Sequence, residues 1–180
     1  INYCGNIIYD GDETMVLNDV GYAKYDKGGN LSFHYYLKDY LGDNRVVMNE
    51  NGAIEQINDY YPTGALMGSS TNGDVQRYKY NGKELDRMNG LDWHDYGARN
   101  YDAALGIWRS QDNLQEIHPD IGSYVYVYNN PMRMADPDGQ DGRDRTIGYI
   151  IGAVTNVIPF SGGLRDTYTP TDPEDYNYSL

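Results

Sequence analysis

Short β-prone runs alternate with turn-forming pairs from residue 2 to about residue 83. Asn-Gly and Gly-Asn pairs tolerate the positive φ that tight hairpin turns require. The pattern therefore predicts a meander of successive antiparallel hairpins. The predicted strands cover residues 6–9, 14–17, 22–25, 31–37, 45–49, 53–61 and 75–80, with turn signals at 10–12, 27–30, 42–44, 51–52, 71–73 and 81–82.

The second half of the chain is less periodic. Residues 112–121 predict a loop, and residues 122–129 alternate tyrosine with valine, which predicts one more strand. The sequence Asp-Pro-Asp-Gly at 136–139 is a strong turn signal, because proline fixes φ and glycine accepts the strained position. Residues 146–158 then place apolar side chains at helical spacing behind Thr146, which predicts the one sizeable helix. Residues 161–180 are typical of a linker.

The predicted fold class is therefore mainly β, an antiparallel meander of hairpins with one C-terminal helix. Tyr-Asp pairs followed by glycine recur as loose repeats, for example at 25–26 and 101–102. Two interpretations stay open from the spacing alone. The hairpins are repeated units of a larger β-shell, or they form an ordinary antiparallel sheet in a chain with many tyrosines.

Composition narrows the function classes. The chain has 20 Tyr against 2 Phe and 2 Trp, which favours sheets that are wetted on one face. Its net charge is −13, with 27 acidic and 14 scattered basic side chains, so no Lys/Arg stripe exists to neutralise phosphates and we expect no nucleic-acid partner. The longest apolar run, 147–160, is shorter than the roughly 20 residues that span a bilayer, so we expect no membrane span.

The sequence predicts neither a metal nor a cofactor. Cys4 is the only cysteine, and the histidines lack the short spacing of an imidazole metal pair. Carboxylate-rich turns at 10–12 and 136–141 do not reach the spacing of an EF-hand loop. Trp93 and Trp108 either anchor the core or form an exposed aromatic platform, and the second interpretation leaves a glycan- or protein-binding surface module open as a function.

Several motifs in fixed order carry a family resemblance. Residues 78–84 read Tyr-Lys-Tyr-Asn-Gly-Lys-Glu, residues 96–102 read Tyr-Gly-Ala-Arg-Asn-Tyr-Asp, and Asp-Pro-Asp-Gly closes the segment at 139. Upstream blocks include Tyr-Leu-Lys-Asp at 36–39 and Tyr-Tyr-Pro-Thr-Gly at 60–64. Over about residues 20–139 the chain closely resembles the C-terminal part of bacterial RHS (rearrangement hot spot) or YD-repeat proteins, including the RHS repeat-associated core of polymorphic toxins.

The resemblance implies a hollow β-shell closed by the core module, with a variable toxin segment downstream. It divides the chain into YD-repeat hairpins at 1–77, the core module at 78–139 and the start of the variable segment at 140–180. The function implied is structural: the chain caps the shell and presents or releases the segment. Implied partners are the protein's own upstream repeats, the downstream segment and an immunity protein, and exposed edge strands favour self-association. We expect a piece of a longer protein that is secreted or associated with the cell surface.

Many members of this family also cut themselves just after Asp-Pro-x-Gly-Leu with an aspartyl-protease-like pair. One carboxylate activates water while a second, protonated one polarises the carbonyl group. Matching by motif implies Asp136, Asp120, Asp112 and Arg99 as the residues of such an autoprotease. Asn113 and Gln140 depart from the family pattern and count against activity. The alternative is that the aspartates only cap turns through nearby backbone N–H groups.

Overall fold

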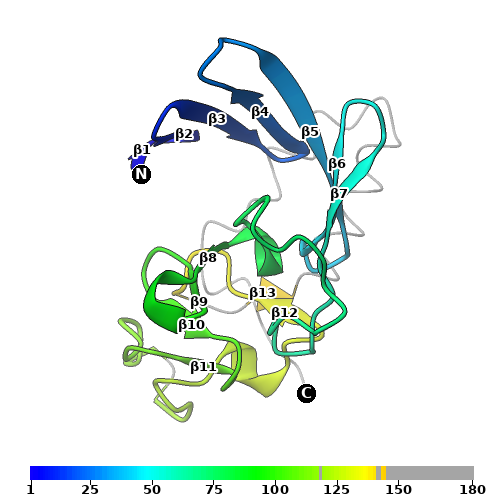
Figure 1. Ribbon diagram of the computed structural model, residues 1–180. Coiled ribbons are helices and arrows are strands. Elements are labelled where there is room, and N and C mark those ends of the chain that lie inside the picture. Colours follow the sequence, from blue (N-terminus) through cyan, green and yellow to red (C-terminus); the bar gives the residue numbers. More distant parts are fainter. Residues whose placement is uncertain (118, 141–142, 145–180) are drawn as a thin grey trace, which may run out of the picture.

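The computed structural model describes residues 1–117, 119–140 and 143–144. Within these residues the protein is mainly β with antiparallel pairing, as the sequence predicts (Figure 1). The helical segments among them are three-residue 3₁₀ turns: η1 (Tyr80–Gly82), η2 (Met88–Gly90) and η3 (Val127–Asn129). The predicted helix at 146–158 and the linker at 161–180 lie outside the described residues. In the described part of the chain, no helix has the length and hydrophobicity that crossing a membrane requires.

The first sheet is a seven-stranded meander in which every strand pairs with its neighbour in sequence. Glycine-containing turns connect most of the strands, as the turn chemistry predicts, whereas Asp19 and Val20 connect β3 to β4. The register is fixed by direct pairs such as Tyr22 opposite His34. The strands are β1 (Asn2–Cys4), β2 (Ile7–Asp10), β3 (Glu13–Asn18), β4 (Gly21–Tyr25), β5 (Leu31–Lys38), β6 (Asn44–Asn49) and β7 (Ile54–Ile57).

A second, smaller sheet follows and lies below the first in the view of Figure 1. Its order is β11-β10-β9-β8, again a simple meander. A separate pair, β12 with β13, ends the described chain. These strands are β8 (Glu84–Asp86), β9 (Trp93–Asp95), β10 (Asn100–Asp102), β11 (Ile107–Trp108), β12 (Met134–Ala135) and β13 (Arg143–Asp144).

The strand predicted at residues 122–129 does not form. Val127, Tyr128 and Asn129 have φ values of 39°, 55° and 58°, which lie in the left-handed region and end any extended strand. The alternating pattern has another origin here, because Tyr126 and Val127 are both buried in the core. Two other predicted strands are shorter than expected: residues 53–61 contain only β7, and residues 75–80 contribute a single bridge from Tyr78 to Glu84.

Tyrosines build the core of the second module. The largest cluster joins Tyr80, Tyr101 and Tyr126 to Trp108, and the rings of Tyr101 and Tyr126 lie 4.1 Å apart between centroids. Trp108 is 1% exposed, so of the two interpretations this ring anchors the core and does not form an exposed aromatic platform. Trp93 is half-buried under the Arg109 guanidinium, 4.8 Å from its ring centroid.

Asn81 in η1 links the two modules. Its side-chain oxygen accepts hydrogen bonds of 2.7 Å from the hydroxyls of Tyr96 and Tyr126, both in the core. Its backbone N–H donates to the Asp43 carboxylate at 2.7 Å, and its side-chain amide donates to the backbone oxygen of Leu41. The turn between β5 and β6 is thereby fixed to the core module.

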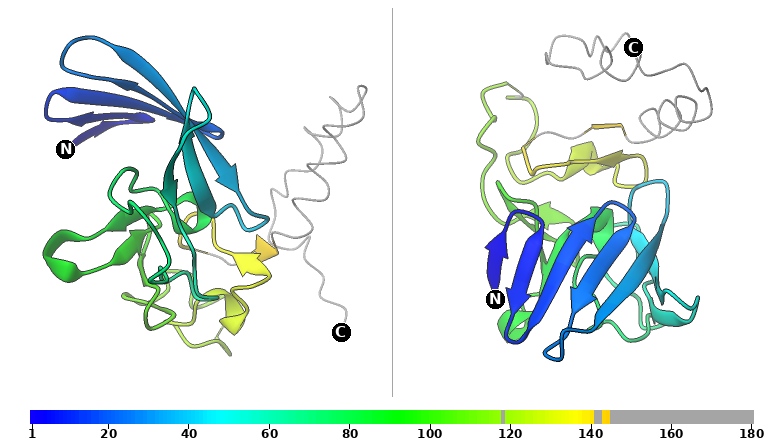
Figure 2. Two further views of the ribbon diagram at one scale, coloured as in Figure 1. Left: turned by 45° about the vertical axis from the view of Figure 1, so that its right-hand side comes forward. Right: turned by 90° about the horizontal axis from the view of Figure 1, so that it is seen from above.

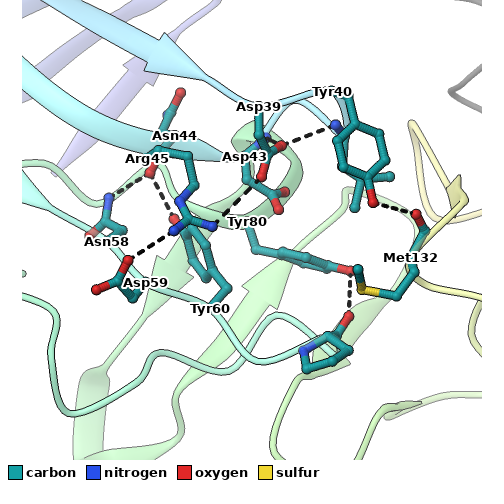
Figure 3. Close-up of polar contacts among 12 residues, drawn as sticks. Asp39, Tyr40, Asp43, Asn44, Arg45, Asn58, Asp59, Tyr60, Tyr80 and Met132 are labelled. Atoms are coloured by element: carbon teal, nitrogen blue, oxygen red, sulfur yellow. Dashed lines mark hydrogen bonds and ion pairs between the residues drawn. The ribbon is translucent and has the colours of Figure 1, made fainter.

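The same turn carries an acidic group that is buried. Burial, and then the nearby charge of Asp39, raise the pKa of Asp43 to about 7. Figure 3 shows the surrounding polar contacts: Arg45 pairs with Asp59 at 2.8 Å, and the Tyr40 hydroxyl donates to the Met132 carbonyl at 2.6 Å. The contact of Tyr40 with Met132 places the end of the β5–β6 hairpin beside the chain that enters β12.

Candidate functional site

The Asp-Pro-Asp-Gly motif forms a fixed turn. Asp136 is buried, and its Oδ1 accepts hydrogen bonds from the backbone N–H groups of Asp138, Gly139 and Gln140 at 3.2, 2.7 and 3.1 Å. Gly139 has φ of +78°, and a Cβ at this position would lie 3.0 Å from the Cβ of Tyr96. Glycine is therefore required both by the backbone conformation and by the close approach of the core.

Consecutive backbone carbonyls of this turn accept hydrogen bonds from the core module. Lys83 Nζ donates to the Pro137 carbonyl oxygen, and the Ala98 N–H donates to that of Asp138 at 3.2 Å. Arg99 Nε donates to the Gly139 carbonyl oxygen at 2.6 Å. The turn is thus held by the hydrogen bonds of the Asp136 side chain within it and by those that the core module donates to its backbone carbonyls.

Arg99 is the cation at the centre of the site. Its side chain is 3% exposed and pairs with Asp112 Oδ2 at 2.8 Å and with Asp136 Oδ2 at 3.5 Å. The guanidinium group also lies 4.3 Å from the ring centroid of Trp108. Such a buried charge is tolerated only with partners of opposite sign, and here it has two.

The structure brings together three of the four residues that the motifs indicate. Arg99 contacts Asp112 and Asp136 directly, whereas Asp120 is exposed and does not line the site. Asp102 lies outside this cluster, where its Oδ1 accepts the Leu105 N–H at 3.1 Å. Asp102 and Asp136 both accept backbone N–H groups within turns, and Asp136 in addition pairs with Arg99.

Burial sets the protonation of Asp136. Desolvation raises its pKa to about 6, although the backbone N–H groups and Arg99 act in the opposite direction. A neutral carboxyl group is therefore well populated in mildly acidic solution. Asp112 is partly exposed and makes the shorter of the two ion pairs with Arg99.

A small cavity of about 30 Å³ adjoins these groups. Arg99, Asp112, Asp136 and Gln140 supply its polar walls, and Val125 and Val127 are among its apolar ones. A water molecule needs about 10–15 Å³ and polar partners, so the cavity has room for one. In the described ranges no group of His, Cys, Asp and Glu has the arrangement of a metal site.

Sequence reasoning missed two residues that hold this site in place. Lys83 contacts the Pro137 carbonyl, and Asn81 fixes the tyrosines on which the module is built. Both belong to the block 78–84 that carries the family resemblance, but the pattern there indicates only a turn. Spacing along the chain gives no sign of contacts 54 residues apart.

Among known proteins, the chain is similar in sequence to a toxin subunit and to tRNA nucleases. No family model matches the chain. It is 31% identical over 132 residues to the toxin subunit YenC2 of Yersinia entomophaga, with 66% of this chain covered. It is 30% identical over 159 residues to the tRNA nuclease WapA of Bacillus subtilis, with 74% of this chain covered. The chain spans only 13% of the length of YenC2 and 6% of that of WapA.

Solved structures agree with these relatives. The crystal structure of TcdB2-TccC3 without its hypervariable C-terminal region matches with a TM-score of 0.60 and 25% identity, and the match covers 71% of this chain and 6% of that one. The Photorhabdus luminescens Tc holotoxin pore matches in fold with a TM-score of 0.59 at 22% identity, covering 74% of this chain and 7% of that one. The homologues are therefore components of toxin proteins, which supports the RHS-type toxin class that the motifs indicate.

Proposed function

We propose that this chain is the C-terminal core of an RHS/YD-repeat toxin-type protein, which caps a β-shell and presents or releases the segment downstream. The observation that carries the proposal is the turn at Asp136–Gly139, held by Lys83, Ala98 and Arg99 at the end of a module on which a β-meander packs. A turn fixed at both ends gives the following segment a defined point of departure.

The first sheet has the properties of a shell fragment. Its strands follow sequence order, and the exposed β1 at its edge offers backbone groups to which upstream repeats can add strands. Contacts between modules, such as the Tyr3 hydroxyl to Glu84 at 2.7 Å and the Asn81 N–H to Asp43 at 2.7 Å, fix the sheet to the core. Within this proposal, residues 1–77 are repeat hairpins, 78–139 the core module and 140–180 the start of the variable segment.

Its partners would be the upstream repeats, the downstream segment and an immunity protein, in a secreted or cell-surface protein. The class of the homologues and the open edge at β1 support the upstream repeats as partners.

The downstream segment should be dispensable for folding of the core. We expect a chain ending at Asp144 to unfold in a single cooperative transition in thermal melts followed by circular dichroism, because the described hydrogen bonds of the module are retained. As the matched control, a chain ending at Arg133 loses β12 and the Asp136 turn and should lose that cooperativity. Loss of cooperative unfolding in the first variant would instead show one integrated domain and contradict the proposal.

Self-cleavage is a second candidate function, favoured by the position of the Gly139–Gln140 peptide bond. Arg99 Nε donates to its carbonyl oxygen at 2.6 Å, and Asp136 Oδ1 lies 3.1 Å from its nitrogen. In the reaction we propose, a water in the adjoining cavity gives its proton to Asp112 and attacks the Gly139 carbonyl carbon. Arg99 stabilises the oxyanion that develops, and protonated Asp136 gives its proton to the Gln140 nitrogen as the C–N bond breaks.

The test is the intact mass of the purified 180-residue chain between pH 4 and pH 8. Cleavage should give fragments 1–139 and 140–180, and Asp136→Asn should prevent it. Because the acid form of Asp136 is required and its pKa is about 6, the cleavage rate should be highest below pH 6 and fall as the pH rises through that value. Asp120→Asn is the matched control and should cut as the wild type does. A single uncut species throughout this pH range would exclude self-cleavage.

A further inference from the structure

A serine, a histidine and a glutamate are joined by hydrogen bonds on the first sheet, and none of them belongs to the site at Asp136. His34 Nε2 lies 3.0 Å from Ser32 Oγ, and His34 Nδ1 lies 2.6 Å from Glu55 Oε2. Ser32 and His34 are two residues apart in β5 and therefore share one face of the strand. Glu55 lies in β7, which is separated from β5 by β6 (Figures 1 and 2).

These contacts fix the position of the proton on the imidazole ring. A carboxylate only accepts hydrogen bonds, so it is Nδ1 that carries the proton and donates it to Glu55. In the neutral ring, Nε2 then keeps its lone pair and accepts the Ser32 hydroxyl. A hydroxyl, an imidazole and a carboxylate in this order can activate a serine as a nucleophile, because the imidazole can take the hydroxyl proton.

A β-bulge explains how Glu55 reaches the histidine. In the pairing of β6 with β7, Met48 lies opposite Ile54. The next pair joins Val47 to Gln56, which leaves Glu55 as an extra residue without a partner on β6. A bulge re-aims a side chain relative to the regular alternation of the strand. The glutamate can therefore extend past β6 to the histidine ring in β5.

The imidazole ring is also held on one of its faces. The ring of Tyr22 stacks on it, with the two centroids 4.4 Å apart and an angle of 4° between the planes, and Tyr22 itself is buried. The side chain of His34 is 10% exposed, whereas Ser32 is only half-buried. The base is therefore held in one orientation, while the serine stays within reach of a small molecule.

The backbone N–H that follows the serine can serve as a donor to a substrate. The pairing of β5 with β6 begins at His34 opposite Asn49, so the Phe33 N–H lies beyond the end of that ladder. It donates instead to the side-chain carboxylate of the exposed Glu50 at 3.2 Å. In hydrolases with a serine nucleophile, the N–H of the next residue commonly binds the oxyanion. A substrate oxygen that gains negative charge can take the place of the Glu50 carboxylate.

We propose that Ser32 is a nucleophile that accepts an acyl group from a carboxylic ester, with His34 as its base and Glu55 as the residue that positions the base. The serine Oγ forms a bond to the acyl carbon while its proton moves to His34 Nε2. The bond to the alcohol oxygen then breaks, and the alcohol leaves with that proton. Water repeats the two steps on the acyl-serine and releases the carboxylic acid.

The charges around the serine select among esters. Glu50 and Glu55 both lie close to it, and the whole chain has a net charge of −13. Esters without negative charge are therefore the favoured substrates. This reaction goes beyond the proposed capping function and uses none of the residues that would carry out self-cleavage.

Labelling of the full chain with an uncharged fluorophosphonate, with the modified peptides identified by mass spectrometry, tests the proposal. Ser32 should be labelled about tenfold or more faster than Ser69, which is more exposed but whose hydroxyl donates to the Asp59 carboxylate at 2.8 Å. His34→Gln should slow labelling of Ser32 about tenfold or more and leave that of Ser69 unchanged. With p-nitrophenyl acetate, the wild type should release nitrophenol about tenfold or more faster than Ser32→Ala. Labelling of Ser32 at the same rate in the wild type and in His34→Gln would overturn the proposal, as would equal release of nitrophenol by the wild type and Ser32→Ala.

Glu55→Gln separates a positioning role from a merely structural one. The variant keeps the size of the side chain, but its amide can donate to Nδ1 and so move the imidazole proton to Nε2, which then cannot accept the serine proton. The NMR shifts of the ring nitrogens of His34 should show this change of tautomer, and labelling of Ser32 should slow about tenfold or more. A folded variant, checked by near-UV circular dichroism, that is labelled at the wild-type rate would contradict the role of Glu55.

Glu50→Ala tests the oxyanion donor. The variant frees the Phe33 N–H and removes a negative charge from the vicinity of the serine. Labelling of Ser32 should therefore become about threefold or more faster, which loss of a structural contact would not produce. An unchanged or lower rate would contradict the assignment of this N–H as the donor.

Discussion

Replacing Arg99 with alanine is expected to lower the free energy of unfolding by about 3–5 kcal/mol, the largest effect of any single substitution at the site. The guanidinium group is 3% exposed, and its removal leaves the buried carboxylate of Asp136 without its cation. The Gly139 carbonyl also loses its hydrogen-bond donor, so the turn before the downstream segment should loosen. Urea denaturation at pH 7 measures the change directly.

Arg109→Ala is the matched control for this prediction. Arg109 also stacks on a tryptophan ring and lies near an aspartate, with Asp102 at 3.8 Å, but its side chain is 39% exposed. We expect a loss of about 1 kcal/mol or less, because water replaces the contacts of an exposed ion pair. Equal losses for the two arginine variants would show that Arg99 is not the centre of a buried charge network.

Asn81→Ala should have the second largest effect, a loss of about 3–4 kcal/mol in the free energy of unfolding. The substitution removes the acceptor of the buried Tyr96 and Tyr126 hydroxyls and the amide that bonds to Leu41. It also places alanine at φ of 50°, a left-handed conformation that asparagine tolerates better.

Asn89→Ala separates these two causes. Asn89 has φ of 55° in η2, also inside a Met-Asn-Gly turn that parallels Tyr-Asn-Gly in η1, but it is exposed. It should lose only about 1 kcal/mol from the backbone conformation. The difference between the two variants in thermal or urea unfolding then measures the buried hydrogen bonds, and a difference near zero would refute their role in joining the two modules.

The hairpins of the first sheet were predictable because their information is local. Turns such as Asn51-Gly52, where Gly52 has φ of +80°, require residues that tolerate this conformation, and the residues between turns prefer extended backbone. The segment 122–129 shows the limit of such reasoning. Its alternation of tyrosine and valine fits a strand, but Tyr126 and Val127 are both buried in one core, and the backbone is left-handed from Val127 to Asn129.

In the candidate site, too, short motifs were readable from the sequence, whereas long-range contacts were not. The motifs indicate Arg99, Asp112, Asp136 and Asp120 alike. Only the folded chain shows that the first three are in contact and that Asp120 lies on the surface. The contribution of Lys83 to the turn at Pro137 had no signal along the chain. Contacts of this kind depend on which side chains the two sheets bring to one place.

The sequence by itself determined the antiparallel meander, the turn at Asp136–Gly139 and the class of protein, because turn chemistry and short motifs act over a few neighbouring residues. Only the tertiary structure decided which aspartates share a cation and how Asn81 joins the modules. Burial and long-range packing set these features, and they appear only when distant segments occupy the same space.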